Sequence, residues 1–294
     1  MPIDQTAVAA LEDRVIGPEH KGMPPTSWGR TVREFLATAP TLDQLETPVL
    51  TVDRAAVATN IAVMADWVRA AGVRLAPHGK TTMAPQLWAD QLAAGSWGIT
   101  LATIWQTQVA RSFGVARILL ANALVDPVGL HWLATELAND PGFEFACWAD
   151  SVETVALMDE HLRTAPGSER VRVLVELGGP RGRTGARTVE QAHAVARAID
   201  RASRLTLAGV GGYEGALAHY RTPNGIRARL SRGTRPPASR TRRWRAVSGV
   251  GDHHRGRQCL SGAGGRIPRP ARRRAGHTWR RDHGSPALRG VRHP

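Results

Sequence analysis

Lysine, cysteine and long apolar runs are scarce in this chain of 294 residues. The two cysteines, Cys147 and Cys259, exclude a disulfide scaffold and a four-cysteine zinc module. No apolar run reaches the roughly 18 residues that a membrane span requires, so we expect no membrane partner. The N-terminus is acidic and lacks the apolar stretch of a signal peptide, which predicts a cytoplasmic protein. Lysine occurs only as Lys21 and Lys80.

The net positive charge of the chain comes from its last quarter. Residues 221–294 carry 20 arginines, no lysine and only two acids, a net charge of +18, whereas residues 1–220 carry 19 basic and 23 acidic residues, a net charge of −4. The total of +14 therefore does not describe a basic, nucleic-acid-binding globule. An arginine-rich tail binds nucleic acid without sequence preference, so we expect no specific nucleic-acid partner.

Apolar segments of strand length alternate with alanine-rich helical segments from residue 47 onward. The predicted strands are 47–53, 73–78, 97–102, 117–122, 143–150, 171–177 and 205–212. The predicted helices include 55–72, 84–95 and 188–200. This alternation predicts an α/β protein with a parallel sheet. A (β/α)8 barrel needs eight strands, one more than the seven predicted. A doubly wound sheet tolerates other numbers of strands, so the count alone does not decide between the two folds.

The chain divides into three parts by pattern. Residues 1–45 have roughly helical spacing interrupted by Pro24 and Pro25, which predicts a helical N-terminal extension. Residues 46–228 carry the strand and helix alternation. Residues 229–294 show neither periodicity and are rich in arginine, glycine and proline, which predicts a disordered or off-frame tail.

Lys80 lies in the segment PHGKTTMAP, directly after a predicted strand. In a barrel this is the edge where catalytic groups gather, and a lysine amine there can form a Schiff base with a carbonyl. The alternative is a solvated loop lysine.

Two further segments follow strands. The segment 175–187, VELGGPRGRTGAR, combines glycines that let a ligand approach the backbone with Arg183, a planar hydrogen-bond donor. The segment 209–219, GVGGYEGALAH, places Tyr213 after glycines. Each segment alone is also compatible with an ordinary strand-to-helix turn.

Taken in order, the motifs resemble a known family. TPVLTVDRAAVATNIAVM, RLAPHGKTTMAP, GITLATIWQTQVA, VELGGPRGRTG and GGYEGALAH resemble the fold-type III pyridoxal-phosphate enzymes, in the branch of D-threonine aldolase, D-serine dehydratase and amino acid deaminases. The resemblance covers about residues 45–228. It implies an incomplete pyridoxal-phosphate-binding (β/α)8-type barrel, like the alanine racemase N-terminal domain.

The resemblance also implies roles for four residues. Lys80 would hold pyridoxal 5'-phosphate as a Schiff base and act as a base at the substrate α-carbon, and His78 would flank it. Arg183 and Tyr213 would line the cofactor pocket. The function implied is that of a lyase or deaminase for a D-amino acid. Active sites in this fold often lie at a dimer interface, so the resemblance also allows a homodimer. A non-catalytic barrel that binds the cofactor for homeostasis is the alternative.

The resemblance ends before the family's eighth strand, phosphate cradle and second domain, where a divalent metal, zinc or manganese, is expected in intact relatives. His253, His254 and Cys259 lack an ordered scaffold, so we expect no metal site. Back-translation with chosen codons, shifted by one base, turns two tail segments into AYLEELAHLHL and VTTTAGGSAYL. This suggests a frameshift near residue 228, and we expect the truncated chain to be inactive.

Overall fold

The computed structural model describes residues 3–179, 182–213 and 246–248. The N-terminal part contains short helices: α1 (Gln5–Ala9), η1 (Ala10–Asp13), η2 (Pro25–Ser27), α2 (Val32–Leu36) and η3 (Leu42–Gln44). It attaches to the rest through Ile3, which is 2% exposed, and through the Asp4 amide, which donates to the Phe113 carbonyl at 2.8 Å. The Asp4 carboxylate also caps α1.

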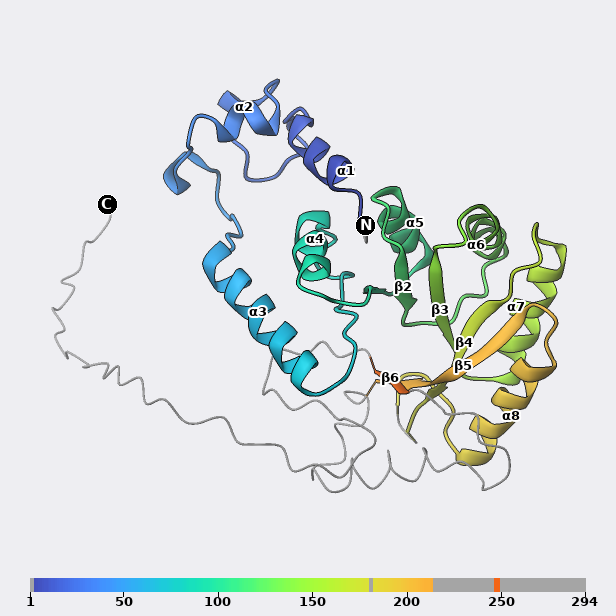
Figure 1. Cartoon of the computed structure of the whole chain (residues 1–294). Coiled ribbons are helices and arrows are strands. Elements are labelled where there is room, and N and C mark those ends of the chain that lie inside the picture. Colours follow the sequence, from blue (N-terminus) through green and yellow to red (C-terminus); the bar gives the residue numbers. More distant parts are fainter. Residues whose placement is uncertain (1–2, 180–181, 214–245, 249–294) are drawn as a thin grey trace, which may run out of the picture. The chain divides into compact units, whose positions relative to one another are not determined.

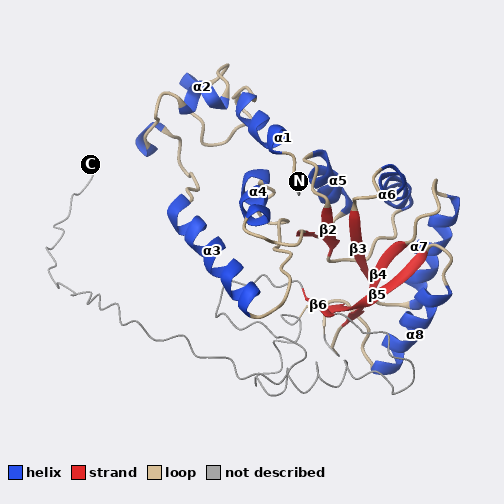
Figure 2. Cartoon of the chain, viewed as in Figure 1, coloured by secondary structure: helices blue, strands red, loops and turns tan. Residues whose placement is uncertain are grey.

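Strands and helices then alternate along the chain (Figure 2). Two helices come first, α3 (Arg54–Ala70) and α4 (Pro85–Ala93). They are followed by β1 (Ile99–Leu101), α5 (Ile104–Ser112), β2 (Arg117–Leu120), α6 (Pro127–Asn139), β3 (Glu144–Ala149), α7 (Val152–Thr164), β4 (Val171–Leu177), α8 (Val189–Arg201), β5 (Leu205–Gly212) and β6 (Ala246–Ser248). The three helices predicted at 55–72, 84–95 and 188–200 are thus confirmed as α3, α4 and α8.

All six strands are parallel and lie side by side in chain order, β1 to β6. A doubly wound sheet would reverse this order at a switch point. Because right-handed crossovers between neighbours in sequential order place every helix on the same face, this arrangement is the one that a β/α barrel uses. Figure 1 shows α5 to α8 following one another along the sheet in the order of the strands.

The two faces of the sheet carry different apolar clusters. Alternate residues such as Ile118, Phe145 and Val173 belong to the main core beneath the helices. The other face carries a smaller cluster of Leu119, Ala146, Trp148 and Leu174. We call the helix-covered side the outer face and the other side the inner face. In a small barrel the inner face of the sheet is filled by side chains, so an apolar inner face is expected for a barrel-type sheet.

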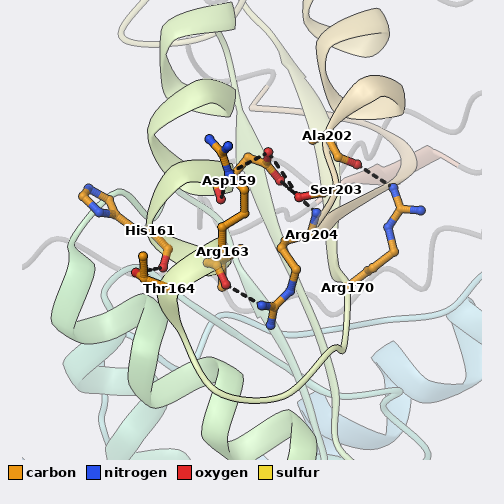
Figure 3. A network of polar contacts seen from close by, with 9 residues as sticks. Asp159, His161, Arg163, Thr164, Arg170, Ala202, Ser203 and Arg204 are labelled. Carbon is orange, nitrogen blue, oxygen red and sulfur yellow. Dashed lines mark hydrogen bonds and ion pairs between the residues drawn. The ribbon is translucent and has the colours of Figure 1, made fainter.

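The amino edge of the sheet is fastened by a polar network (Figure 3). The Asp159 carboxylate accepts from the Arg204 amide at 2.8 Å and from the Ser203 hydroxyl at 3.1 Å. Arg170 donates to the carbonyls of Leu205 at 2.7 Å and Ala202 at 2.9 Å. The bonds of Asp159 tie α7 to the entry of β5, and those of Arg170 tie the entry of β4 to the same segment, so this edge serves stability.

Two predicted strands differ from the structure. The segment 47–53 forms no strand: Leu50 is 92% exposed and Val52 is 58% exposed. A strand needs a backbone partner, and none of the described strands lies beside this segment. The segment 73–78 is reduced to one parallel bridge between His78 and Thr100.

The remaining five strand predictions are confirmed as β1 to β5, with shorter bounds at several ends. β6 lies where we expected no regular element, so that expectation is wrong for these three residues. β5 offers an open backbone edge, and a segment of three residues is long enough to pair with it. Of the expected tail, only these residues are described, and His253, His254 and Cys259 lie outside the described residues.

Candidate active site

The carboxyl edge of the sheet is built from four similar junctions. Because the strands are parallel, their carboxyl ends meet at one edge. The helices that follow begin there on side-chain caps: Thr103 for α5, Asp126 for α6, Ser151 for α7 and Thr188 for α8. Each cap accepts a backbone N–H of the first turn, which fixes where each strand-to-helix loop ends.

His78 lies on the inner face of the sheet. It pairs with Thr100, which is in register with Leu119 of the inner-face cluster. Backbone hydrogen bonds on both sides hold this pairing: the Gly79 amide donates to the Thr100 carbonyl at 2.9 Å, and the Thr100 amide donates to the Pro77 carbonyl at 2.8 Å. The segment of His78 therefore occupies a sheet position before β1, although only one bridge defines it.

Gly79, the next residue, faces the outer side of the sheet, toward Trp88 and Ile99 of the main core. A Cβ on Gly79 would stand 2.5 Å from the Trp88 Nε1 and 2.6 Å from the Ile99 Cγ2, so no larger residue fits. Lys80 follows in a half-buried turn at the carboxyl edge, and its carbonyl accepts from the Gln106 side-chain amide at 3.3 Å. The packed glycine and the bond from α5 fix the backbone from which the lysine extends.

The loop after β4 folds back onto its own strand. Leu177 bridges Ala186, with the Ala186 amide donating to the Glu176 carbonyl at 2.8 Å and the Gly178 amide donating to the Ala186 carbonyl at 3.0 Å. Gly185 has a φ of +93°, a left-handed conformation that favours glycine. This closure holds Arg183 and Thr184 at the carboxyl edge.

Two carboxylates accept hydrogen bonds from this loop. Glu176, 5% exposed on β4, accepts from the Thr184 hydroxyl at 2.5 Å. Asp150, just past β3, accepts from the Gly185 amide at 3.3 Å. Burial raises the pKa of Glu176, and the charge of Asp150 adds to the rise. The bond from Thr184 and the nearby guanidinium of Arg183 act in the opposite direction on that pKa.

Arg183 and Tyr213 meet across the ends of β4 and β5. The guanidinium carbon of Arg183 lies 5.7 Å from the centre of the Tyr213 ring, within reach of a cation–π contact. Arg187 stiffens the loop further by donating to the Gly179 carbonyl at 2.8 Å. The structure therefore brings together two of the four predicted site residues and places His78 and Lys80 at the same edge, before β1.

Sequence reasoning missed Glu176, Asp150 and Trp148. A glutamate inside the apolar strand sequence VRVLVEL was a usable signal, because a buried carboxyl needs a partner. Trp148 carried no such signal, since a tryptophan in a strand is ordinary core. Its Nε1 is nevertheless buried with no hydrogen-bond partner among the described residues.

The donor set fits the group that the resemblance implies. A primary amine, a guanidinium, an imidazole and a phenol stand at one edge, which suits a carbonyl compound with an anionic group. Gly211 leaves space for the Trp148 indole on the inner face, because a Cβ at this position would stand 2.8 Å from Nε1. These features are compatible with a flat, anionic cofactor over the inner face.

Other chemistry finds less support in the described part of the chain. Burial raises the pKa of the Cys147 thiol to about 12, so it behaves as a core residue. No group of three or more histidine, cysteine or acidic side chains among the described residues forms a metal cluster. Within residues 3–179 and 182–213 no helix has both the length and the apolarity to cross a bilayer.

The sequential parallel sheet and the helices on its outer face define the class of barrel-type α/β proteins. Within this class, the chain is similar to a 3-hydroxy-D-aspartate aldolase, a D-threonine aldolase and a D-threo-3-hydroxyaspartate dehydratase. It is 26% identical over 188 residues to 3-hydroxy-D-aspartate aldolase of Paracoccus denitrificans (strain Pd 1222), covering 64% of this chain and 48% of the relative.

Two further relatives agree. D-threo-3-hydroxyaspartate dehydratase of Delftia sp. (strain HT23) is 28% identical over 193 residues, covering 65% of this chain and 50% of the relative. The crystal structure of D-threonine aldolase from Filomicrobium marinum superposes with a TM-score of 0.56 and 28% identity, covering 65% of this chain and 50% of that one. No family model matches the chain. The chain spans about half the length of the curated relatives it matches.

Proposed function

We propose that this chain is the cofactor-binding part of a pyridoxal-phosphate-dependent lyase for a D-amino acid with a β-hydroxyl group. Lys80 holds the cofactor covalently, and His78, Arg183 and Tyr213 line its site. The relatives named above are aldolases and a dehydratase for such substrates, which supports the substrate class. Their names leave aldol cleavage and dehydration equally open.

The position of Lys80 carries this proposal. It is half-buried, it follows the His78 bridge at the carboxyl edge, and its backbone is fixed by Gly79 and Gln106. Lys21, the other lysine, is exposed in the N-terminal extension. An amine in a fixed position at this edge is the group that a carbonyl cofactor requires.

The chain's own residues would divide the work as follows. Lys80 takes or returns a proton at the substrate α-carbon, while His78 beside it shapes the same side of the site. Arg183, supported through Thr184 and Gly185, attracts an anionic group, and Tyr213 gives a flat face beside it. When bound, the cofactor supplies an electron sink for the carbanion.

Turnover is a separate part of the proposal. A closed barrel has eight strands, whereas the described sheet has six and the bridge at His78. We propose that residues 46–228 form the cofactor part, behind a helical extension, and that residues 1–294 as given do not turn over substrate. We also propose a cytoplasmic location and assembly as a homodimer.

Borohydride reduction in the presence of pyridoxal 5'-phosphate tests the role of Lys80. The full chain is treated, digested and analysed by mass spectrometry. We expect the modification on the peptide that contains Lys80, lost in Lys80→Arg and kept in Lys21→Arg, the matched control. Equal labelling of both lysines, or none, would refute the proposal.

A turnover assay with D-threonine and with D-3-hydroxyaspartate tests the rest. We expect labelling of Lys80 without turnover in the chain as given. If a version with a restored reading frame binds the cofactor but acts on no D-amino acid, the non-catalytic cofactor carrier is the better function.

A further inference from the structure

Trp148 is a buried donor on the inner face of the sheet. It lies on β3, is 2% exposed, and packs with Leu119, Ala146 and Leu174 in the small inner-face cluster. Its Nε1 has no hydrogen-bond partner among the described residues. An indole N–H can only donate, so a bound molecule that satisfies it must bring an acceptor atom.

The surroundings of this N–H belong to the candidate site. Gly211 of β5 touches the indole, and Gly211 is in register with Glu176 of β4. Tyr213 comes two residues after Gly211, directly after the end of β5. Asp150, two residues after Trp148, accepts from Gly185 in the loop that carries Arg183. The indole thus lies on the inner face, close to the carboxyl ends of β4 and β5, after which Arg183 and Tyr213 follow.

A second buried indole provides a contrast. Trp88 Nε1 also lacks a partner among the described residues, but Trp88 packs in the main core of the outer face, against Gly79. It faces helices and apolar side chains rather than the ends of β4 and β5. Burial of an unpartnered N–H is unfavourable, and on the inner face a ligand can relieve it.

We propose that Trp148 is a cofactor-binding residue: its indole N–H donates a hydrogen bond to an acceptor atom of pyridoxal 5'-phosphate on the inner face. This inference rests on the proposed function, and it adds a specific donor that the sequence motifs do not contain. A phenyl ring fills much of the space of the indole but has no N–H. Trp148→Phe therefore removes the donor while keeping apolar contact with the cluster.

Cofactor titration of the full chain tests the proposal. Binding is followed by the absorbance band of the Lys80-linked cofactor and by the dissociation constant, for the wild type, Trp148→Phe and Trp132→Phe. Trp132 packs against the outer core from α6 and is the matched control. We expect Trp148→Phe to bind on the order of tenfold more weakly, as the loss of one hydrogen bond predicts. The absorbance band should shift, and Trp132→Phe should match the wild type.

The outcomes separate this inference from the proposed function. If the wild type is labelled on Lys80 and Trp148→Phe binds as tightly with the same band, the inference is wrong and the proposed function stands. If the wild type is not labelled on Lys80, the proposed function fails and the inference fails with it.

Should Trp148→Phe not fold, the wild type labelled with ¹⁵N at the indole nitrogens decides. One solvent-protected indole N–H among the nine tryptophans is expected to move downfield when the cofactor is added. If no protected indole signal moves, the inference is overturned.

Discussion

Gly79 packs against the indole of Trp88 so closely that no space is left for a side chain. A Cβ there would stand 2.5 Å from Nε1. The contact joins the residue between His78 and Lys80 to α4 and to the main core. The backbone that carries the candidate lysine is thus set by packing on the opposite face of the sheet.

Gly79→Ala tests this relationship. The added methyl group must displace Trp88 or Ile99, both fully buried, and such overpacking costs about 1–3 kcal/mol. We expect a lower thermal midpoint and less borohydride labelling of Lys80 at a given cofactor concentration. A variant with normal stability and normal labelling would show that the segment adjusts freely.

The pH dependence of stability should reveal Glu176. Its pKa in the fold lies above the ordinary value of 4.5, chiefly through burial, so the folded chain holds the proton more tightly than the unfolded chain. Stability from this group is full below 4.5 and declines as pH rises through the raised pKa. We expect Glu176→Gln to become progressively more stable than the wild type as pH rises.

Glu190 provides a control of opposite sign. Its own backbone N–H and Thr188 lower its pKa, so its contribution is present above 4.5 and is lost as pH falls. Glu190→Gln should therefore lose stability relative to the wild type at neutral pH, and the difference should shrink in acid. Urea unfolding from about pH 2.5 to about pH 8 measures both. The same trend for both variants would contradict the assignment of Glu176.

Arg111 should matter more for stability than a comparable surface arginine. It is 13% exposed, contacts Glu136 at 3.0 Å and Asp140 at 2.8 Å, and lies 4.2 Å above the Phe143 ring. Its partners Glu136 and Asp140 are 28% and 44% exposed, so water can solvate them when Arg111 is removed. Arg111→Ala should therefore lower the free energy of unfolding by about 1–3 kcal/mol, below the loss for a fully buried pair.

The matched control is Arg69→Ala. Arg69 pairs with Asp66, but both side chains are more than 70% exposed, at 73% and 74%. An exposed pair of this kind contributes about 0–1 kcal/mol. Chemical denaturation of both variants gives the comparison, and equal losses would mean that burial of Arg111 has no effect.

Cys147 should be unreactive in the native protein. Its pKa of about 12 keeps the thiol protonated, and its side chain is covered by the main core. Iodoacetamide near pH 8 should leave the peptide of Cys147 unmodified until denaturant is added. Rapid native labelling would indicate that the outer core opens.

The sequence predicted the sheet better where strands find partners within the described chain. β1 to β5 follow the predicted apolar segments because each pairs with its neighbours. The segment 47–53 has the same composition, but composition does not reveal whether a partner strand exists. The segment 73–78 also lacks regular pairing, because among the described strands only β1 lies beside it and its other side has no partner.

The site was predictable where residues carry rare chemistry at strand ends. Lys80, Arg183 and Tyr213 stand out by type and position. Arg183 and Tyr213 lie in contact, and the roles of all three stay predictions. Glu176 and Trp148 are distinguished by burial and by neighbours distant in sequence, Thr184 and Gly211. Such roles depend on which strands lie side by side, and a local pattern does not contain that information.

The caps at Thr103, Asp126, Ser151 and Thr188 give each strand-and-helix repeat its own start signal. Each repeat therefore specifies its junction without help from the next one. Modularity of this kind lets the loops at the carboxyl edge diverge independently during evolution, with new specificities arising one loop at a time while the scaffold beneath stays the same.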